Sequence, residues 1–112
     1  MSEELQIEFQ KWEGTGNTFA IIDGYKYSGF ELNSLENRVV TRICEQENTD
    51  GLIVLGPSEI ANADFKCDYR NVDGSRSFCG NGTRASLEYA RRKGWVVDKA
   101  TIEASDGLHK VE

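Results

Sequence analysis

Apolar and polar residues alternate along several short stretches of the chain, and this period of two is typical of half-buried strands. The clearest case is Phe65, Cys67 and Tyr69, whose sequence neighbours are all charged. Leu52–Leu55 predicts a short strand that is wholly apolar. The predicted strands span residues 5–12, 19–23, 52–55, 63–71, 96–97, 100–104 and 108–111, and the predicted turns are Gly14–Asn17 and Asp106–Gly107.

A different period marks the first predicted helix. Apolar residues recur at every fourth position from Leu35 to Ile43, which places an apolar stripe on one helix face and predicts a helix over residues 34–47. Asn33 is the predicted N-cap, with Glu36 three residues further on as in a capping box. The polar run that begins at Asn48 ends this helix.

A second helix is predicted from about Gly82 to Lys93, where Gly94 supplies the residue that tolerates a left-handed conformation after the last turn. Residues 24–33 are predicted to form a loop. Strands therefore dominate and do not alternate strictly with helices. This order predicts one α+β domain, with a mixed or antiparallel sheet curled around a helix.

Composition narrows the class of protein. The chain has 112 residues, enough for one domain, and a net charge of −6, which is opposite to the basic surface that nucleic acid requires. The N-terminus is acidic and has no apolar signal-peptide core, and no apolar run approaches the ~18 residues of a membrane span. The cysteines number three, without a C-x-x-C pair, as expected for free thiols in a reducing compartment. We therefore expect a cytoplasmic protein that binds neither nucleic acid nor a membrane.

The segment from Asn71 to Arg84 carries the chemistry. It places Cys79 between a polar turn and the start of a predicted helix, whose free backbone N–H groups favour an ionised thiol. A thiolate can act as a base or a nucleophile. The glycines on either side of Asn81 are expected to let a ligand approach the backbone closely.

This segment resembles the signature N-x-D-G-S-x-x-x-C-G-N-G-x-R of diaminopimelate epimerase, an amino-acid epimerase that uses no cofactor. The segment from Lys11 to Phe19 is similar to the K-x-x-G-x-G-N-x-F segment of the same family. The resemblance covers nearly the whole chain and implies the N-terminal half of a two-domain enzyme, with the C-terminal domain absent from residues 1–112. It implies interconversion of LL- and meso-diaminopimelate by two cysteines in lysine and cell-wall biosynthesis, without a metal or organic cofactor, and no activity of this half alone.

The resemblance also assigns roles to particular residues. Cys79 corresponds to one of the two catalytic thiols, whereas Asn17, Asn71, Gly80 and Asn81 correspond to residues that hold the amino-acid substrate. The implied partners are that small-molecule substrate and the missing C-terminal domain. An apolar face left uncovered by that domain also makes a homo-oligomer a reasonable expectation.

The chain departs from the family at two positions, because Thr18 replaces the usual aspartate and Gly51 replaces a glutamine that touches substrate in many members. These departures leave open another cofactor-free amino-acid racemase of the same superfamily. A non-catalytic binding or redox-sensing module is the alternative from a different class.

The remaining candidate residues have ordinary structural explanations. Cys44 and Cys67 lie on predicted apolar faces and are expected to be buried, and His109 is expected to be solvated. The cysteines and His109 include no local pair of metal ligands, so no metal site is predicted. The glycine-containing turn before Asn17 lacks the further residues of a nucleotide-binding loop.

Overall fold

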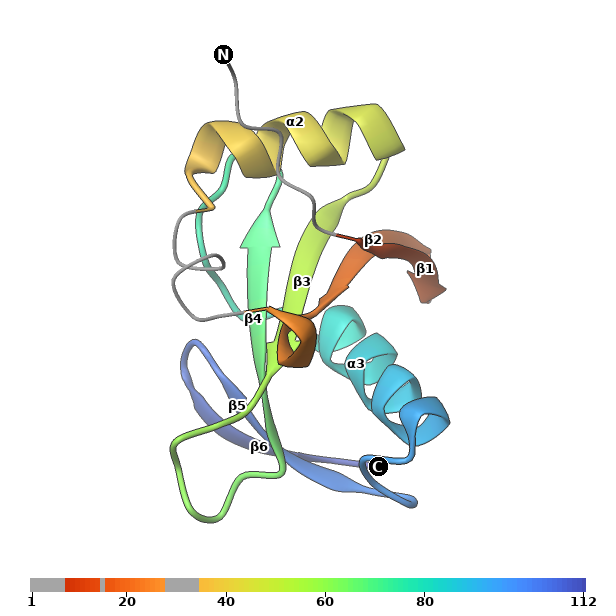
Figure 1. Cartoon of the computed structure of the whole chain (residues 1–112), viewed down its shortest axis with the longest axis vertical. Helices are drawn as coiled ribbons and strands as arrows, with labels where there is room; N and C mark the ends of the chain where they lie inside the picture. Colours follow the sequence, from red (N-terminus) through yellow and green to blue (C-terminus); the bar gives the residue numbers. More distant parts are fainter. Residues whose placement is uncertain (1–7, 15, 28–34) are drawn as a thin grey trace.

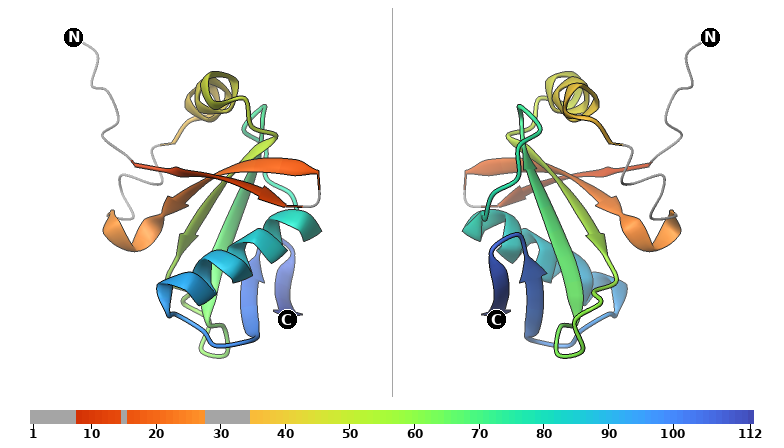
Figure 2. Two further views of the ribbon diagram at one scale, coloured as in Figure 1. Left: turned by 90° about the vertical axis from the view of Figure 1, so that its right-hand side faces the viewer. Right: turned by 90° about the vertical axis from the view of Figure 1, so that its left-hand side faces the viewer.

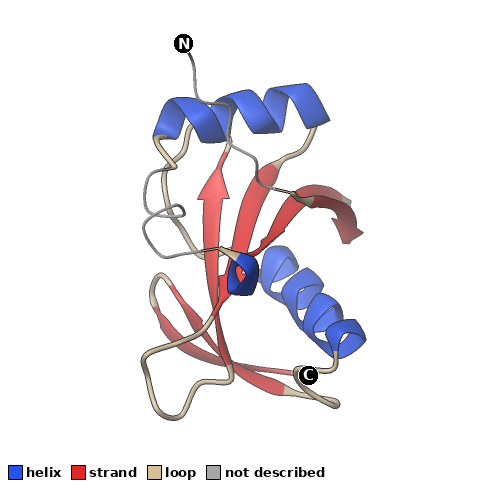
Figure 3. Cartoon of the chain, viewed as in Figure 1, coloured by secondary structure: helices blue, strands red, loops and turns tan. Residues whose placement is uncertain are grey.

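The structure, a computed structural model, describes residues 8–14, 16–27 and 35–112. Within these residues, one mixed sheet of six strands is combined with two helices and a short 3-10 helix (Figures 1 and 3). The elements in chain order are β1 (Gln10–Gly14), β2 (Asn17–Asp23), η1 (Gly24–Lys26), α2 (Asn37–Glu47), β3 (Gly51–Gly56), β4 (Phe65–Asn71), α3 (Gly80–Lys93), β5 (Ala100–Ala104) and β6 (Gly107–Val111).

The strands lie side by side in the same order as in the sequence, from β1 to β6. β2 and β3 are parallel, as are β4 and β5, and the other neighbouring pairs are antiparallel. Each parallel pair is joined by a connection that contains a helix, α2 in the first case and α3 in the second, because parallel strands need a long crossover. The predicted α+β class with a mixed sheet is confirmed.

The two helices cover opposite faces of the sheet. On β2, Phe19 and Ile21 belong to the apolar cluster that contains residues of α3, whereas Ala20 and Ile22 belong to the cluster that contains Val40 of α2. This division follows from the period-two geometry of a strand. α3 contacts β1, β2, β3, β4 and β6, so the sheet curls around it as predicted (Figure 2).

The start of α2 differs from its prediction. The helix begins at Asn37, whereas residues 35 and 36 are not helical, and the predicted N-cap Asn33 lies outside the described residues. Glu36 has an extended backbone (φ −72°, ψ 159°) and occupies the N-cap position without a side-chain cap hydrogen bond, so the predicted capping box is wrong. The predicted end is confirmed, because Asn48 adopts the left-handed conformation with φ 56°.

Other boundaries shift by a few residues. The first strand was predicted over 5–12, but residues 8 and 9 are not in a strand and β1 continues to Gly14. The strand predicted at Val96–Val97 is wrong: these residues pair with no strand among the described residues, and Val97 is 81% exposed. Residues 24–26, predicted as loop, form η1. Neither helix among the described residues has the length and apolar composition needed to cross a membrane.

Candidate active site

Cys79 lies at the start of α3, as the sequence predicts. It is the N-cap residue, with an extended backbone (φ −134°, ψ 112°), and its Sγ accepts a hydrogen bond from the Gly82 amide at 3.4 Å. Its carbonyl oxygen accepts from the amide and the hydroxyl of Thr83 at 2.9 and 2.7 Å. The side chain is partly exposed. The sulfur therefore stands at the positive end of the helix dipole, on a residue that is only partly buried.

Two of the predicted substrate-binding residues meet beside this helix start. The side-chain amide of Asn81, in the first turn of α3, donates to Oδ1 of Asn17 at 2.6 Å. Asn17 is the first residue of β2. Asp50 holds the next residue, Thr18, by two hydrogen bonds. Oδ2 of Asp50 accepts from the Thr18 amide at 2.9 Å, and the Asp50 amide donates to the Thr18 carbonyl at 2.7 Å. The structure thus brings residues 64 positions apart into one site.

Asn71, the third predicted substrate contact, ends β4 and opens the turn before Cys79. Its side-chain nitrogen donates to the carbonyl and hydroxyl of Ser75 and to the hydroxyl of Ser77, at 3.2, 3.0 and 3.1 Å. Asp73 accepts from the hydroxyl and amide of Ser75, and these bonds lower the pKa of Asp73. The Asn71 amide hydrogens are used within the turn, so its contact with a substrate stays a prediction.

The buried side chain of Arg70 connects this turn to the start of α2 by hydrogen bonds. Arg70 is 3% exposed, and its guanidinium donates to the Gly74 carbonyl at 2.6 Å, to the Leu35 carbonyl at 3.2 Å and to Oδ1 of Asn37 at 2.9 Å. Burial is the main cause that lowers the pKa of Arg70. Gly74 has φ +90°, and a Cβ there would lie 2.5 Å from Cα of Asn37. The turn therefore needs glycine where it meets the start of α2.

The two glycines beside Asn81 have different environments. A Cβ at Gly80 would meet only Phe78, at 4.0 Å, so this side of the helix start is open to a ligand. A Cβ at Gly82 would lie 3.3 Å from Cδ1 of Ile53, inside the core. The expectation that both glycines admit a ligand is therefore wrong for Gly82, whose missing side chain instead lets α3 pack closely on the sheet.

The other two cysteines are buried, as predicted. Cys44 is 1% exposed and Cys67 is 3% exposed, and all three cysteines are free. Burial raises the pKa of Cys67 to about 11, and its sulfur lies 3.3 Å from the Ser86 hydroxyl. Cys79 is the one cysteine that is not buried.

The aromatic residue next to Cys79 in the sequence is Phe78. Phe78, which is 43% exposed, stacks on the imidazole of His109 with centroids 4.2 Å apart, and Nε2 of His109 lies 2.7 Å from Oδ1 of Asp106. The sequence predicted that His109 is solvated. In the structure its ring is instead partly covered by Phe78. Trp12 and Trp95 pack against the apolar cluster around α3.

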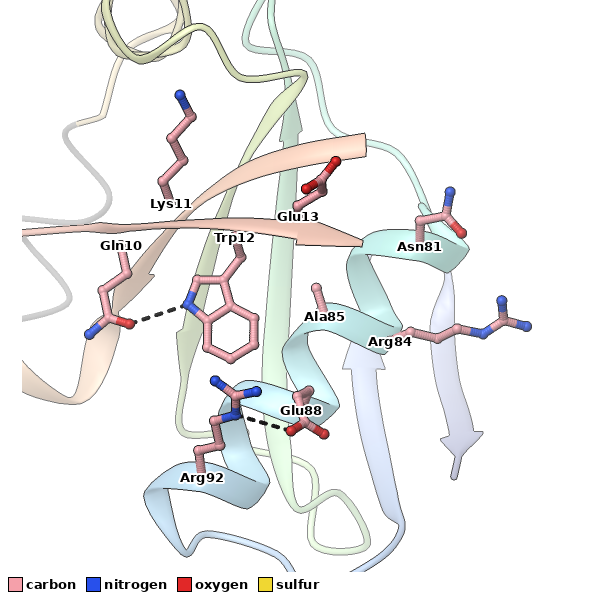
Figure 4. A pocket seen from close by; sticks show the side chains of 9 residues that line it. All are labelled: Gln10, Lys11, Trp12, Glu13, Asn81, Arg84, Ala85, Glu88 and Arg92. Atoms are coloured by element: carbon pink, nitrogen blue, oxygen red, sulfur yellow. Dashed lines mark hydrogen bonds and ion pairs between the residues drawn. The ribbon is translucent and has the colours of Figure 1, made fainter. Parts of the chain in front are cut away.

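A groove of about 530 Å³ lies next to the site, between β1 and α3 (Figure 4). Arg92 crosses it, with its guanidinium 4.9 Å from the centroid of the Trp12 ring and 3.1 Å from a carboxylate oxygen of Glu88. Asn81 is the only predicted site residue that lines it. This groove therefore adjoins the Cys79 site, but Cys79 does not line it.

Comparison with known proteins identifies relatives of the chain. It is 34% identical over 107 residues to the diaminopimelate epimerase of Flavobacterium psychrophilum, covering 92% of this chain and 40% of that protein. The corresponding values are 36% over 111 residues, 95% and 38% for the enzyme of Desulforudis audaxviator, and 33% over 114 residues, 95% and 41% for that of Aquifex aeolicus. The chain thus spans about 40% of the length of the curated relatives it matches.

Solved structures share the fold. A phenazine biosynthesis protein of the PhzF family from Bacillus anthracis matches with a TM-score of 0.61 and 22% identity, over 93% of this chain and 33% of that one. A PhzC/PhzF protein from Clostridium difficile matches with the same TM-score and 17% identity, over 85% of this chain and 33% of that one. No protein-family model matches the chain. Over nearly its whole length, the chain is homologous to one part of diaminopimelate epimerase.

Proposed function

We propose that the chain is the N-terminal half of a cofactor-independent amino-acid epimerase, in which Cys79 exchanges a proton with the α-carbon of the substrate. The observation that supports this most directly is the partly exposed Cys79 at the N-cap of α3, with the Gly82 amide 3.4 Å from its sulfur. Helix N-termini stabilise negative charge, so they favour the thiolate that a base requires.

The same helix start suits the charge that develops during the reaction. The α-proton of an amino acid is a weak acid, and negative charge spreads onto the substrate carboxylate as the proton leaves. Fixed N–H donors lower the energy of that charge because they need no reorganisation. The open backbone at Gly80 and the side chains of Asn81 and Asn17 provide donors and acceptors at this position. We assign Asn17, Asn71, Gly80 and Asn81 to substrate binding.

Inversion of a stereocentre requires a second proton carrier on the opposite face of the α-carbon. Cys44 and Cys67 cannot serve, because both are buried, and burial holds Cys67 in its protonated form. We therefore assign the second thiol to a C-terminal domain beyond these 112 residues, as the 40% coverage of the relatives allows. In this proposal, the isolated chain does not invert its substrate.

The substrate assigned is LL- and meso-diaminopimelate, since the relatives are named for that reaction. The mechanism needs no metal ion or organic cofactor. The cytoplasm, where thiols stay reduced, is the compartment in which it would operate.

The test uses the full product of the gene that encodes this chain. Deuterium incorporation at the α-carbon in heavy water and optical inversion are measured with LL-diaminopimelate, and with proline, histidine and glutamate as competing candidates. Cys79→Ser should abolish both signals, whereas Cys44→Ala, which alters a buried thiol on α2, should leave the turnover number of folded protein within about threefold of wild type. Inversion of proline or glutamate instead of diaminopimelate would overturn the assigned substrate. Full activity of Cys79→Ser would overturn the assigned base.

A further inference from the structure

Tyr69 packs against the same glycine as Cys79. It lies on β4, is 8% exposed, and faces α3 in the apolar cluster. Cδ1 of Tyr69 and Cβ of Cys79 each lie 3.5 Å from the point where a side chain at Gly82 would begin. Both side chains therefore pack beside Gly82, in the first turn of α3.

The hydroxyl end of Tyr69 occupies the space that Gly51 leaves open. A Cβ at Gly51 would lie 2.6 Å from the Tyr69 hydroxyl oxygen and 2.5 Å from Cε1. The sheet register explains this approach, because Ile53 on β3 pairs with Tyr69 on β4 and Gly51 is the next residue of β3 on the same face. The absence of a side chain at Gly51 thus allows the phenol to lie under the site.

Burial and the nearby Cys79 raise the pKa of Tyr69. Burial is the largest cause that raises the pKa of Tyr69 to about 12, and Cys79 is the next. A phenol with this pKa keeps its proton throughout the range in which thiols ionise, so its O–H is available as a donor. Cys44 and Asp50 are the other ionisable groups that raise the pKa of Tyr69.

We propose that Tyr69 is a positioning residue for Cys79, whose hydroxyl donates a hydrogen bond to the thiolate beside the Gly82 amide. This role rests on the proposed function, since it matters for catalysis only if Cys79 is the base. The hydrogen bond stabilises the charged sulfur and fixes its direction, while the phenol itself gains and loses no proton. Because Tyr69 lies on the side of α3 that faces the sheet, a hydrogen bond from its hydroxyl would leave the opposite side of the sulfur free for substrate.

The experiment removes the hydroxyl and follows the sulfur. In Tyr69→Phe, the rate at which iodoacetamide alkylates Cys79 is measured by mass spectrometry from pH 6 to pH 10 in the folded 112-residue chain. Below the midpoint of the pH profile, the variant should react about tenfold more slowly than wild type, because a lost hydrogen bond to a charged group lowers the thiolate fraction. Above the midpoint it should react equally fast or faster, because the less stabilised thiolate is the stronger nucleophile.

Tyr89→Phe is the matched control. Tyr89 is also nearly buried, at 3% exposure, but its ring neighbours are Trp12 and Trp95, so its hydroxyl loss should leave the Cys79 profile unchanged. Gly51→Ala should reproduce the effect of Tyr69→Phe, because the added methyl group displaces the phenol while Tyr69 remains.

The outcomes separate this proposal from the proposed function, since alkylation needs no substrate. Coincident profiles for wild type and Tyr69→Phe would overturn the role, as would equal displacement of the profiles by Tyr69→Phe and Tyr89→Phe. If Tyr69→Phe does not fold, judged by circular dichroism and by loss of protection at Cys67, the Gly51→Ala profile decides in the same way. A displaced profile in a protein without epimerase activity would support the positioning role and refute the assigned reaction.

Discussion

Replacement of Arg70 by methionine should destabilise the chain strongly. The guanidinium is 3% exposed and donates three hydrogen bonds, to the Gly74 carbonyl, the Leu35 carbonyl and the Asn37 side chain. Methionine fills most of the volume but donates nothing, so these acceptors lose their charged partner. The turn before Cys79 then loses its attachment to the segment at the start of α2.

The magnitude follows from opposing effects. A hydrogen bond from a charged donor contributes about 1.5–3 kcal/mol, and an acceptor left without a partner in the interior costs about 1–3 kcal/mol. Against this, removal of a buried charge relieves a desolvation penalty, and burial already lowers the pKa of Arg70. We expect a net loss of about 3 kcal/mol in the free energy of unfolding, or roughly 10–15 °C in Tm for a domain of this size.

Urea and thermal unfolding followed by circular dichroism measure the effect. Arg76→Met is the control in the same turn, because the Arg76 side chain is 53% exposed and its pair with Asp68 at 2.9 Å should contribute less than about 1 kcal/mol. Arg70→Lys keeps the charge but not the planar fork of donors, so its stability should fall between those of wild type and Arg70→Met. If the free energy of unfolding of Arg70→Met lies within about 1 kcal/mol of that of Arg76→Met, the hydrogen bonds of Arg70 do not hold the turn in place.

Two further predictions concern the packing beneath the site and its dependence on pH. Gly80→Ala should leave Tm unchanged or raise it slightly. Gly82→Ala should have a Tm several degrees below that of Gly80→Ala, because the added methyl group would lie 3.3 Å from Ile53. Thermal unfolding of the two variants measures this difference, and equal Tm values would contradict it. Burial raises the pKa of Cys67 to about 11 and that of Tyr69 to about 12, so the folded chain keeps protons that the unfolded chain loses above about pH 9. The free energy of unfolding should therefore fall between about pH 9 and pH 11, by up to about 1.4 kcal/mol per pH unit for each group, and a flat series of urea titrations would refute the burial argument.

Local patterns in the sequence predicted the elements whose structure depends on local physics. The alternation of Phe65, Cys67 and Tyr69 identified β4 and its buried face, and the left-handed residues Asn48 and Gly94 identified the ends of both helices. Where tertiary contacts decide, the patterns failed. Val96 and Val97 have the composition of a strand, but no neighbouring strand among the described residues pairs with them.

The site was predicted in part. The motif around Cys79 indicated the thiol at a helix start, because an N-cap is a local feature, and the family resemblance singled out Asn17 and Asn81. Arg70 was missed, because alternation with inward-facing Tyr69 predicts an exposed side chain. Its face of the sheet is covered by residues near the start of α2, a contact that no local pattern records. The approach of Tyr69 to Gly51 likewise depends on the register between β3 and β4.

Cys79 has two roles in this proposal, because it caps α3 and acts as the base. Serine is therefore the informative replacement at this position. The side chain accepts from the Gly82 amide, so the residue caps the helix that presents it. A serine hydroxyl is a strong N-cap acceptor but, with its high pKa, a poor base, so Cys79→Ser should keep the helix start while proton transfer is lost. Alanine would remove the cap as well, at a cost of about 1 kcal/mol. A stable serine variant without exchange would therefore place the loss in the chemistry of the sulfur and not in the fold that holds it.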